Sequence, residues 1–160
     1  MNNTNNKPSD ETMAIAARQG WMAVLAKADA GRLETLWTEC APPPAWRFLR
    51  RPETGMTMLR GRAGGTGVRF NIGEMTVTRC SVRLDDGSGR VGHAYIAGCD
   101  VRHAEIAALA DALLQAPSTR VDIAESLVAP LACEQEAARA AAARKAAATR
   151  VEFFTVVRSE

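Results

Sequence analysis

Three consecutive prolines at positions 42–44 place the firmest constraint on how this chain folds. Proline lacks the amide hydrogen that a helix interior needs, and it disfavours helical backbone in the residue before it. Upstream, apolar residues recur at three- and four-residue spacing, which predicts a helix beginning after residue 10 and a second, short helix carrying Leu33, Leu36 and Trp37. The helical region must therefore end near Cys40, before a different kind of structure.

The segment from Trp46 to Gly98 has an extended pattern punctuated by glycine. Short glycine-bearing links between extended runs favour antiparallel hairpins over crossover connections. The predicted strands lie near 46–51, 56–62, 66–72, 75–84 and 90–98, and the predicted turns lie at 52–55, 63–65, 73–74 and 85–89.

Residues 78–84 alternate strictly between apolar and polar side chains, as in a strand with one buried face. One face of this strand carries Cys80, Val82 and Leu84, and the other carries Arg79, Ser81 and Arg83. We therefore expect a sheet whose polar face bears arginines.

Helical periodicity returns after Asp100, a suitable N-cap for a helix over 101–115 that Pro117 closes. A short helix is expected near 122–128, and Pro130 suits the first turn of an alanine-rich helix reaching about residue 148. Residues 151–157 have the pattern of a strand added to the edge of the sheet. The predicted fold is α+β, an antiparallel sheet flanked by N- and C-terminal helices, with a disordered leader over 1–10 and a single domain over 11–160.

Composition excludes several classes of protein. The 20 basic residues include only the lysines Lys7, Lys27 and Lys145, and the net charge of +2 is too small to indicate nucleic-acid binding by itself. No run approaches the roughly 20 apolar residues of a membrane span, and no N-terminal segment resembles an export signal. We therefore expect a cytoplasmic protein whose four cysteines, Cys40, Cys80, Cys99 and Cys133, stay reduced.

The sequence predicts no self-sufficient active site. His93 and His103 could be combined with Cys80 and Cys99 into a zinc site, but their spacings match no familiar zinc motif. His103 and Glu105 are two residues apart at a helix start, where their side chains diverge. The catalytic residues are therefore unknown, and no metal is expected.

Arginines are concentrated between Trp46 and Arg83. This segment contains eight arginines, and its only acidic residues are Glu53 and Glu74. The loop GRAGGTG at 61–67 lacks the lysine and the following helix of a phosphate-binding P-loop, so its glycines indicate a hairpin turn. Its exposed amides and arginines could still receive an anion. We rank a partner-binding surface first, a phosphate site second and nucleic-acid binding third. The candidate residues are Arg60, Arg62, Gly64, Gly65, Arg69 and Arg79.

Three long segments carry a resemblance to a known family. RPETGMTMLRGRAGGTGVRFNIGEMTVTRCSVRL at 51–84, GHAYIAGCDVRHAEIAALADALLQ at 92–115 and the C-terminal TRVEFFTVVR resemble the PhnG family, the G subunit of the carbon–phosphorus lyase core. The opening helix, with RQGWMAVLAKA at 18–28, is similar too. The resemblance covers nearly the whole chain apart from the polar leader.

The resemblance implies a function that the residues alone do not indicate. Family members assemble with the H, I and J subunits, two copies of G per core, and act with the ATPase-like K and L subunits. The assembly transfers the ribose 5-triphosphate of ATP to an alkylphosphonate, usually methylphosphonate, and releases adenine. ATP would then be a substrate of the complex, with no cofactor bound by this chain. The alternative is an arginine-rich phosphate- or nucleic-acid-binding module without an enzymatic role.

Overall fold

Two helices precede the prolines, as the periodicity predicts. The computed structural model describes residues 10–150, in which α1 spans Asp10–Ala26 and α2 spans Ala30–Glu39. Asp29 caps α2, because its carboxylate accepts a hydrogen bond of 2.9 Å from the amide of Arg32. The three large apolar residues expected on this helix, Leu33, Leu36 and Trp37, are buried.

The sheet has three strands, two of them long, where five short ones were predicted between Trp46 and Gly98. β1 (Trp46–Arg62), β2 (Arg69–Leu84) and β3 (Val91–Ala97) form an antiparallel sheet in the order β1-β2-β3. The predicted turns at 63–65 and 85–89 are confirmed, whereas those at 52–55 and 73–74 are wrong. The predicted α+β class with an antiparallel sheet is confirmed.

The two wrong turns have a common physical cause: glycine and proline are tolerated in a strand that lies at a sheet edge. Gly55 pairs with Val77 and Gly73 pairs with Leu59, so both glycines continue the ladder. Pro52 lies in the register shift between Arg50 and Glu53, a position that needs no ladder donor.

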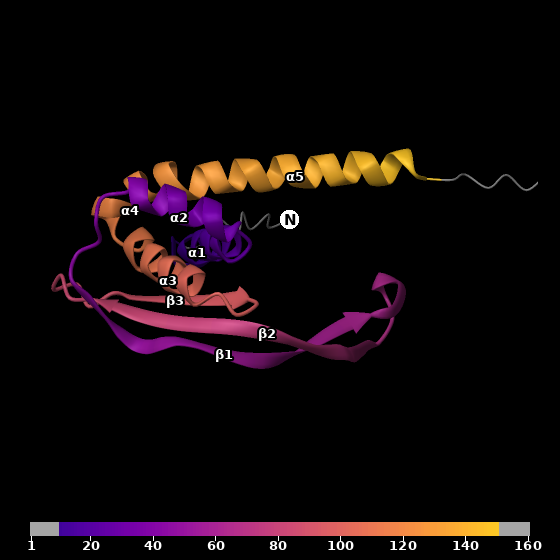
Figure 1. The fold of residues 1–160 in the computed structure, drawn as a ribbon, viewed down its shortest axis with the longest axis horizontal. Coiled ribbons are helices and arrows are strands. Elements are labelled where there is room, and N and C mark those ends of the chain that lie inside the picture. The colour runs from indigo at the N-terminus through magenta and orange to yellow at the C-terminus, as the bar shows by residue number, and fades with distance from the viewer. Residues whose placement is uncertain (1–9, 151–160) are drawn as a thin grey trace, which may run out of the picture.

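All α-helices in the described part of the chain lie on one side of the sheet (Figure 1). Helix α3 (Val101–Leu114) packs directly on it and is capped by Asp100, as predicted. The contact between α3 and β3 is close, because a Cβ on Gly92 would lie 1.9 Å from the carbonyl oxygen of Ala108. The expected buried face of β2, with Cys80, Val82 and Leu84, joins this core.

The last helices follow one another along the chain without a loop between them. α4 (Pro117–Ile123) runs through a π-helical segment, Ala124–Val128, into α5 (Ala129–Ala148). The helix after Pro130 is confirmed, and the short helix expected near 122–128 begins earlier, at Pro117. Leu131 is the buried residue of α5, and the C-terminal part of that helix extends beyond the helical layer (Figure 1).

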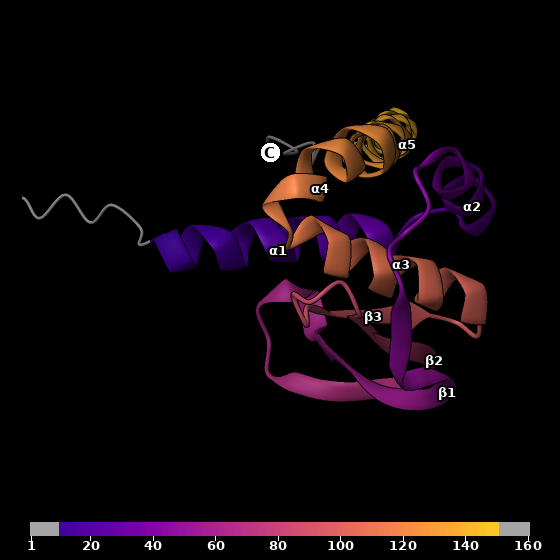
Figure 2. The ribbon, with the colours of Figure 1, turned by 90° about the vertical axis from the view of Figure 1, so that its left-hand side faces the viewer.

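The β1–β2 hairpin also extends beyond the rest of the fold. Strand β3 pairs with β2 only from Val77 to Arg83, and Val77 faces Gly55 across the hairpin. Residues 56–76 therefore form a two-stranded projection, called the arm below. Figure 1 shows the arm continuing past the end of α3, and Figure 2 shows α3 lying over the sheet from the opposite end of the molecule.

Two sequence predictions fall on residues that the structure does not describe. The C-terminal edge strand at 151–157 lies outside the described range, and so does the leader apart from Asp10, which begins α1. None of the helices within residues 10–150 is both long and apolar enough to cross a bilayer.

Candidate functional site: an arginine-bearing arm

Five of the six candidate residues lie together at the end of the arm. Arg62 pairs with Arg69 across the hairpin, Arg60 pairs with Asn71, and Gly64 and Gly65 form the connecting turn. Residues paired across an antiparallel ladder share a face, so three guanidinium groups occupy one face of the arm. Within residues 10–150 none of the three forms an ion pair. This face of the arm therefore gathers three arginines that form no ion pair, and Glu74, which pairs with Met58, is the acidic residue of the arm.

The turn at the end of the arm needs its glycines for backbone geometry. Gly64 and Gly65 have φ values of +60° and +80°, a region that side-chain-bearing residues rarely adopt. The amide of Gly67 donates to the carbonyl of Ala63 at 3.1 Å, which closes a short 3₁₀ turn. Strand β2 follows this turn directly, and no helix begins there, so the segment is a hairpin tip rather than a phosphate-binding P-loop.

Arg79 is separated from the other candidates. It lies in the three-stranded part of the sheet, where it donates to Glu53 at 2.7 Å, and Arg50 donates to the same carboxylate at 2.6 Å. Desolvation acts to raise the pKa of Glu53, but the hydrogen bonds and charges of Arg79 and Arg50 outweigh it and leave the pKa below its ordinary value. The charge of Arg79 is therefore already paired, unlike the charges on the arm.

The arm also exposes large apolar side chains. Val68 is 90% exposed and Met56 is 70% exposed, and the others are Met58, Leu59, Phe70 and Ile72. A cavity of about 520 Å³ adjoins the base of the arm, between Met56, Met75 and Tyr95, with Lys27 at its lining. Exposed apolar residues beside charged ones are typical of a surface that contacts another macromolecule.

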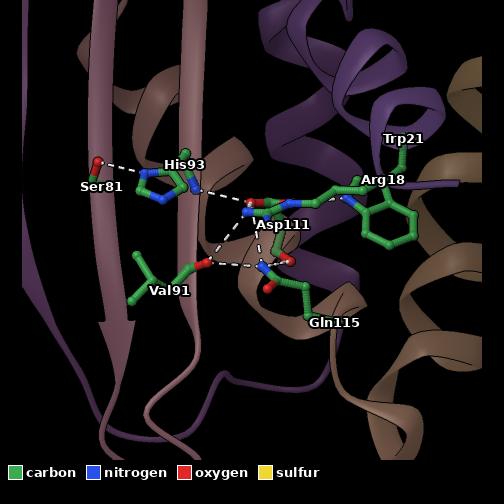
Figure 3. Close-up of polar contacts among 7 residues, drawn as sticks. All are labelled: Arg18, Trp21, Ser81, Val91, His93, Asp111 and Gln115. Carbon is green, nitrogen blue, oxygen red and sulfur yellow. Dashed lines mark hydrogen bonds and ion pairs between the residues drawn. The ribbon is translucent and has the colours of Figure 1, made fainter. Parts of the chain in front are cut away.

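A second polar cluster lies under the helices, and the sequence did not reveal it. The carboxylate of Asp111 is fully buried in α3 and accepts hydrogen bonds from Arg18 at 2.7 and 3.1 Å and from the indole of Trp21 at 2.9 Å (Figure 3). It also accepts from the backbone amide of His93 at 3.0 Å. The one available signal was an acid within the apolar stripe of the 101–115 helix.

This cluster contains a serine, a histidine and an aspartate, but it is not a catalytic triad. The Ser81 hydroxyl lies 2.9 Å from Nδ1 of His93 (Figure 3). In a triad the aspartate orients the imidazole ring, whereas Asp111 contacts only the backbone amide of His93. The carboxylate joins α1, α3 and β3, so its role is structural.

The remaining reactive groups are also separated. No group of three His, Cys, Asp or Glu side chains within the described range lies close enough to hold a metal ion. His103 is buried and its Nε2 lies 2.8 Å from the carbonyl of Leu25. The four cysteines are free, and burial, aided by the charge of Glu105, raises the pKa of the Cys80 thiol to about 11.

The fold and this surface define a class of protein: a small α+β domain protein that presents an arm, with no assembled catalytic group among residues 10–150. Comparison with known proteins identifies the family. A family model described as "Phosphonate metabolism protein PhnG" matches residues 16–159, and the chain therefore belongs to the PhnG family. A relative from Rhizobium meliloti (strain 1021) is 42% identical over 154 residues, which cover 96% of each chain. That relative is named alpha-D-ribose 1-methylphosphonate 5-triphosphate synthase subunit PhnG.

Proposed function

We propose that this chain is a subunit of an alpha-D-ribose 1-methylphosphonate 5-triphosphate synthase within a carbon–phosphorus lyase core. The assembly would transfer the ribose 5-triphosphate of ATP to methylphosphonate and release adenine. The observation that carries the proposal is the 42% identity, across 96% of both chains, to a protein named as a subunit of that synthase. Identity at this level over the full length supports a shared place in phosphonate metabolism.

We assign this chain a supporting role, with the reacting groups on its partners. Ser81 and His93 are the hydrogen-bonded serine–histidine pair, but Asp111 contacts only the backbone amide of His93 and does not orient its ring, and residues 10–150 contain no metal-binding group. The proposed partners are the H, I and J subunits, with two copies of this chain per core, and the ATPase-like K and L subunits. ATP would be bound by the complex, in the cytoplasm, and no cofactor by this chain.

Co-purification tests the proposal directly. The tagged chain is expressed with the H, I and J subunits, and the mass of the purified particle is measured. We expect a stable particle that contains all four subunits and two copies of this chain. Recovery of the tagged chain alone, from cells that also contain the other subunits in soluble form, would contradict the proposed function.

A second role is favoured by the unpaired charges on the arm. Arg60, Arg62 and Arg69 could hold the triphosphate or the phosphonate, since a guanidinium fork matches phosphate oxygens. Charge reversal of each arginine to glutamate separates this role from assembly. An intact complex with a raised KM for ATP would indicate phosphate binding, and loss of the complex would indicate a contact between subunits. Arg79→Glu is the comparison, because Arg79 is paired with Glu53.

Nucleic-acid binding is the remaining alternative, and the composition of the arm argues against it. Phe70 is the only aromatic residue among residues 56–76, whereas proteins that bind single strands usually interleave several aromatics with basic residues. Absence of binding to an arbitrary oligonucleotide at low salt would remove this alternative.

A further inference from the structure

Among residues 10–150, nothing pairs with the outer edge of β1. Strand β1 has 17 residues and pairs only with β2 among the strands of the described range. Its first half is protected against another strand, because Pro52 lies there together with two register shifts. From Glu53 to Leu59 the register is unbroken and contains no proline. Residues 53–59 are therefore the part of this edge that can accept a further strand, and they are called the open strip below.

The direction of the backbone groups in the open strip follows from one hydrogen bond. The amide of Gly98 donates to the carbonyl of Thr76 at 2.8 Å, so the backbone groups of Thr76 point toward the β3 side of the sheet. Thr76 faces Met56 in the β1–β2 register, and this pair is then a non-hydrogen-bonded pair. The N–H and C=O of Met56 must point outward, away from β2. By the alternation of a strand, those of Thr54 and Met58 point outward too.

The side chains of the open strip and its flank indicate the chemistry of what binds there. Met56 is 70% exposed and Met58 is 47% exposed, so an apolar partner would remove both from water. The strip is followed by Arg60 and Arg62, whose charges form no ion pair in the described part of the chain. A strand with apolar residues followed by carboxylates would complement both features.

A second copy of this chain is a poor occupant of the open strip. Antiparallel pairing of two copies about Met56 would place Arg62 of one copy opposite Arg50 of the other, and Arg60 opposite Pro52. Like charges placed directly opposite in a ladder are destabilising. The charge pattern therefore favours an acidic partner over self-association.

We propose that the open strip of β1 accepts, by strand addition, an extended segment of a partner subunit that carries apolar and acidic residues. Main-chain hydrogen bonds from Thr54, Met56 and Met58 supply the docking energy, and the arm arginines select the acidic segment. This inference rests on the proposed function, since it needs an assembly with other subunits. Beyond the proposed function, it specifies which surface of this chain binds the partner, how the partner segment binds, and which charge that segment carries.

Hydrogen exchange of the unmodified assembly tests the inference without any variant. The outward amides of Thr54, Met56 and Met58 should exchange rapidly in the isolated chain and at least about 100-fold more slowly in the complex with the H, I and J subunits. The inward amides of Thr57 and Leu59 are the internal control, because β2 already holds them. Rapid exchange of the three outward amides in an intact complex would overturn the strand-addition proposal and leave the proposed function standing. Failure to form any complex would overturn both.

A proline substitution gives a second, independent test. Met56→Pro removes an outward donor while keeping the bonds to β2, and Met56→Ala is the matched control that keeps the donor and removes the side chain. We expect Met56→Pro to weaken assembly by more than about tenfold and Met56→Ala to have a clearly smaller effect. Circular dichroism of each variant establishes that the fold is retained. Equal assembly by a folded Met56→Pro variant and the unmodified chain would overturn the proposal.

Discussion

Asp111 shows how a single buried side chain holds three elements of this fold together. Its carboxylate is fully buried and is compensated by Arg18 of α1, by Trp21 and by the backbone amide of β3 at His93. A buried charge is tolerated only when its partners satisfy it, and removing one member leaves the others unpaired in a poorly solvated place.

We expect Asp111→Ala to lower the free energy of unfolding by about 3–5 kcal/mol, because it strands the partly buried guanidinium of Arg18 and two other donors. Urea unfolding of the isolated chain at low concentration measures this. Glu134→Ala is the control, since Glu134 forms an exposed pair with Arg32, and we expect it to cost at most about 1 kcal/mol. Equal losses in the two variants would show that Asp111 is not the anchor described here.

The cysteines should differ sharply in reactivity, because only the thiolate reacts. Burial, with a further contribution from the charge of Glu105, raises the pKa of Cys80 to about 11. At pH 8 we expect iodoacetamide to modify the exposed Cys99 and Cys133 of the isolated folded chain and to leave Cys80 unmodified. Peptide mass spectrometry reads the modification site by site. Modification of Cys80 as fast as Cys99 would contradict its burial.

The same raised pKa links stability to pH. The folded state keeps the Cys80 thiol neutral, so its contribution to stability is complete below the ordinary thiol pKa of about 8.5 and is lost as the pH rises toward 11. We expect the free energy of unfolding to fall more between pH 8 and 10.5 for the unmodified chain than for Cys80→Ser, whose hydroxyl does not titrate there. A parallel decline in both proteins would mean that Cys80 makes no such contribution.

At the scale of elements, the backbones of helix α3 and strand β3 can pack closely because residue 92 is a glycine. A Cβ at this position would lie 1.9 Å from the carbonyl oxygen of Ala108 and 2.6 Å from the amide nitrogen of Ala112. Both neighbours are backbone atoms of a helix and cannot rotate away, so the helix would have to move off the sheet.

We expect Gly92→Ala to destabilise the fold by about 3 kcal/mol or more, at the upper end of overpacking effects. Gly73→Ala is the matched control, because a Cβ on Gly73 meets no atom within 4 Å, and its effect should stay within about 1 kcal/mol. Thermal unfolding of the two variants measures how far each substitution lowers the stability of the fold. A stable Gly92→Ala protein would require the contact between α3 and β3 to be looser than the structure has it.

Elements could be predicted from the sequence where a local rule determines them. The Asp100 carboxylate caps an amide three residues further on, and the turn glycines at 64 and 65 adopt a backbone that suits glycine, so both positions follow from residue type. Gly55, Gly73 and Pro52 are different, because whether they interrupt a strand depends on what the neighbouring strand does. The pairing of β1 with β2 over their full length is a tertiary property, and no local pattern reports it.

The candidate site, too, could be predicted from the sequence only in part. The sequence indicated the arginines of the central segment, but only the register separates Arg79, paired with Glu53, from the unpaired Arg60, Arg62 and Arg69. The Asp111 cluster joins residues up to 93 positions apart, which explains why spacing did not reveal it.

At the scale of the whole molecule, the arm and the core should be separable. None of residues 56–76 belongs to the buried apolar core, and Gly55 faces Val77 in a hydrogen-bonded pair suited to a two-residue turn. We expect a chain in which an Asn-Gly turn replaces residues 56–76 to keep its circular dichroism and to unfold within about 1 kcal/mol of the original. It should resist aggregation better, because it loses an exposed apolar edge.

Light scattering and co-purification with the H, I and J subunits complete this measurement. The shortened chain should remain monomeric at concentrations where the original aggregates, and it should no longer enter the assembly. A shortened chain that still enters the assembly would show that the arm is dispensable for it. A chain that unfolds would show that the arm stabilises the core.

The exposure of the arm has a consequence for how its sequence evolves. None of these 21 positions belongs to the buried core, so, apart from the turn glycines Gly64 and Gly65, what restricts them acts mainly from outside the chain. Substitutions there would be accepted or rejected according to the product of another gene. The arm should then change in step with that gene, and a subunit moved into a distant relative's complex should succeed only when its arm comes from the host.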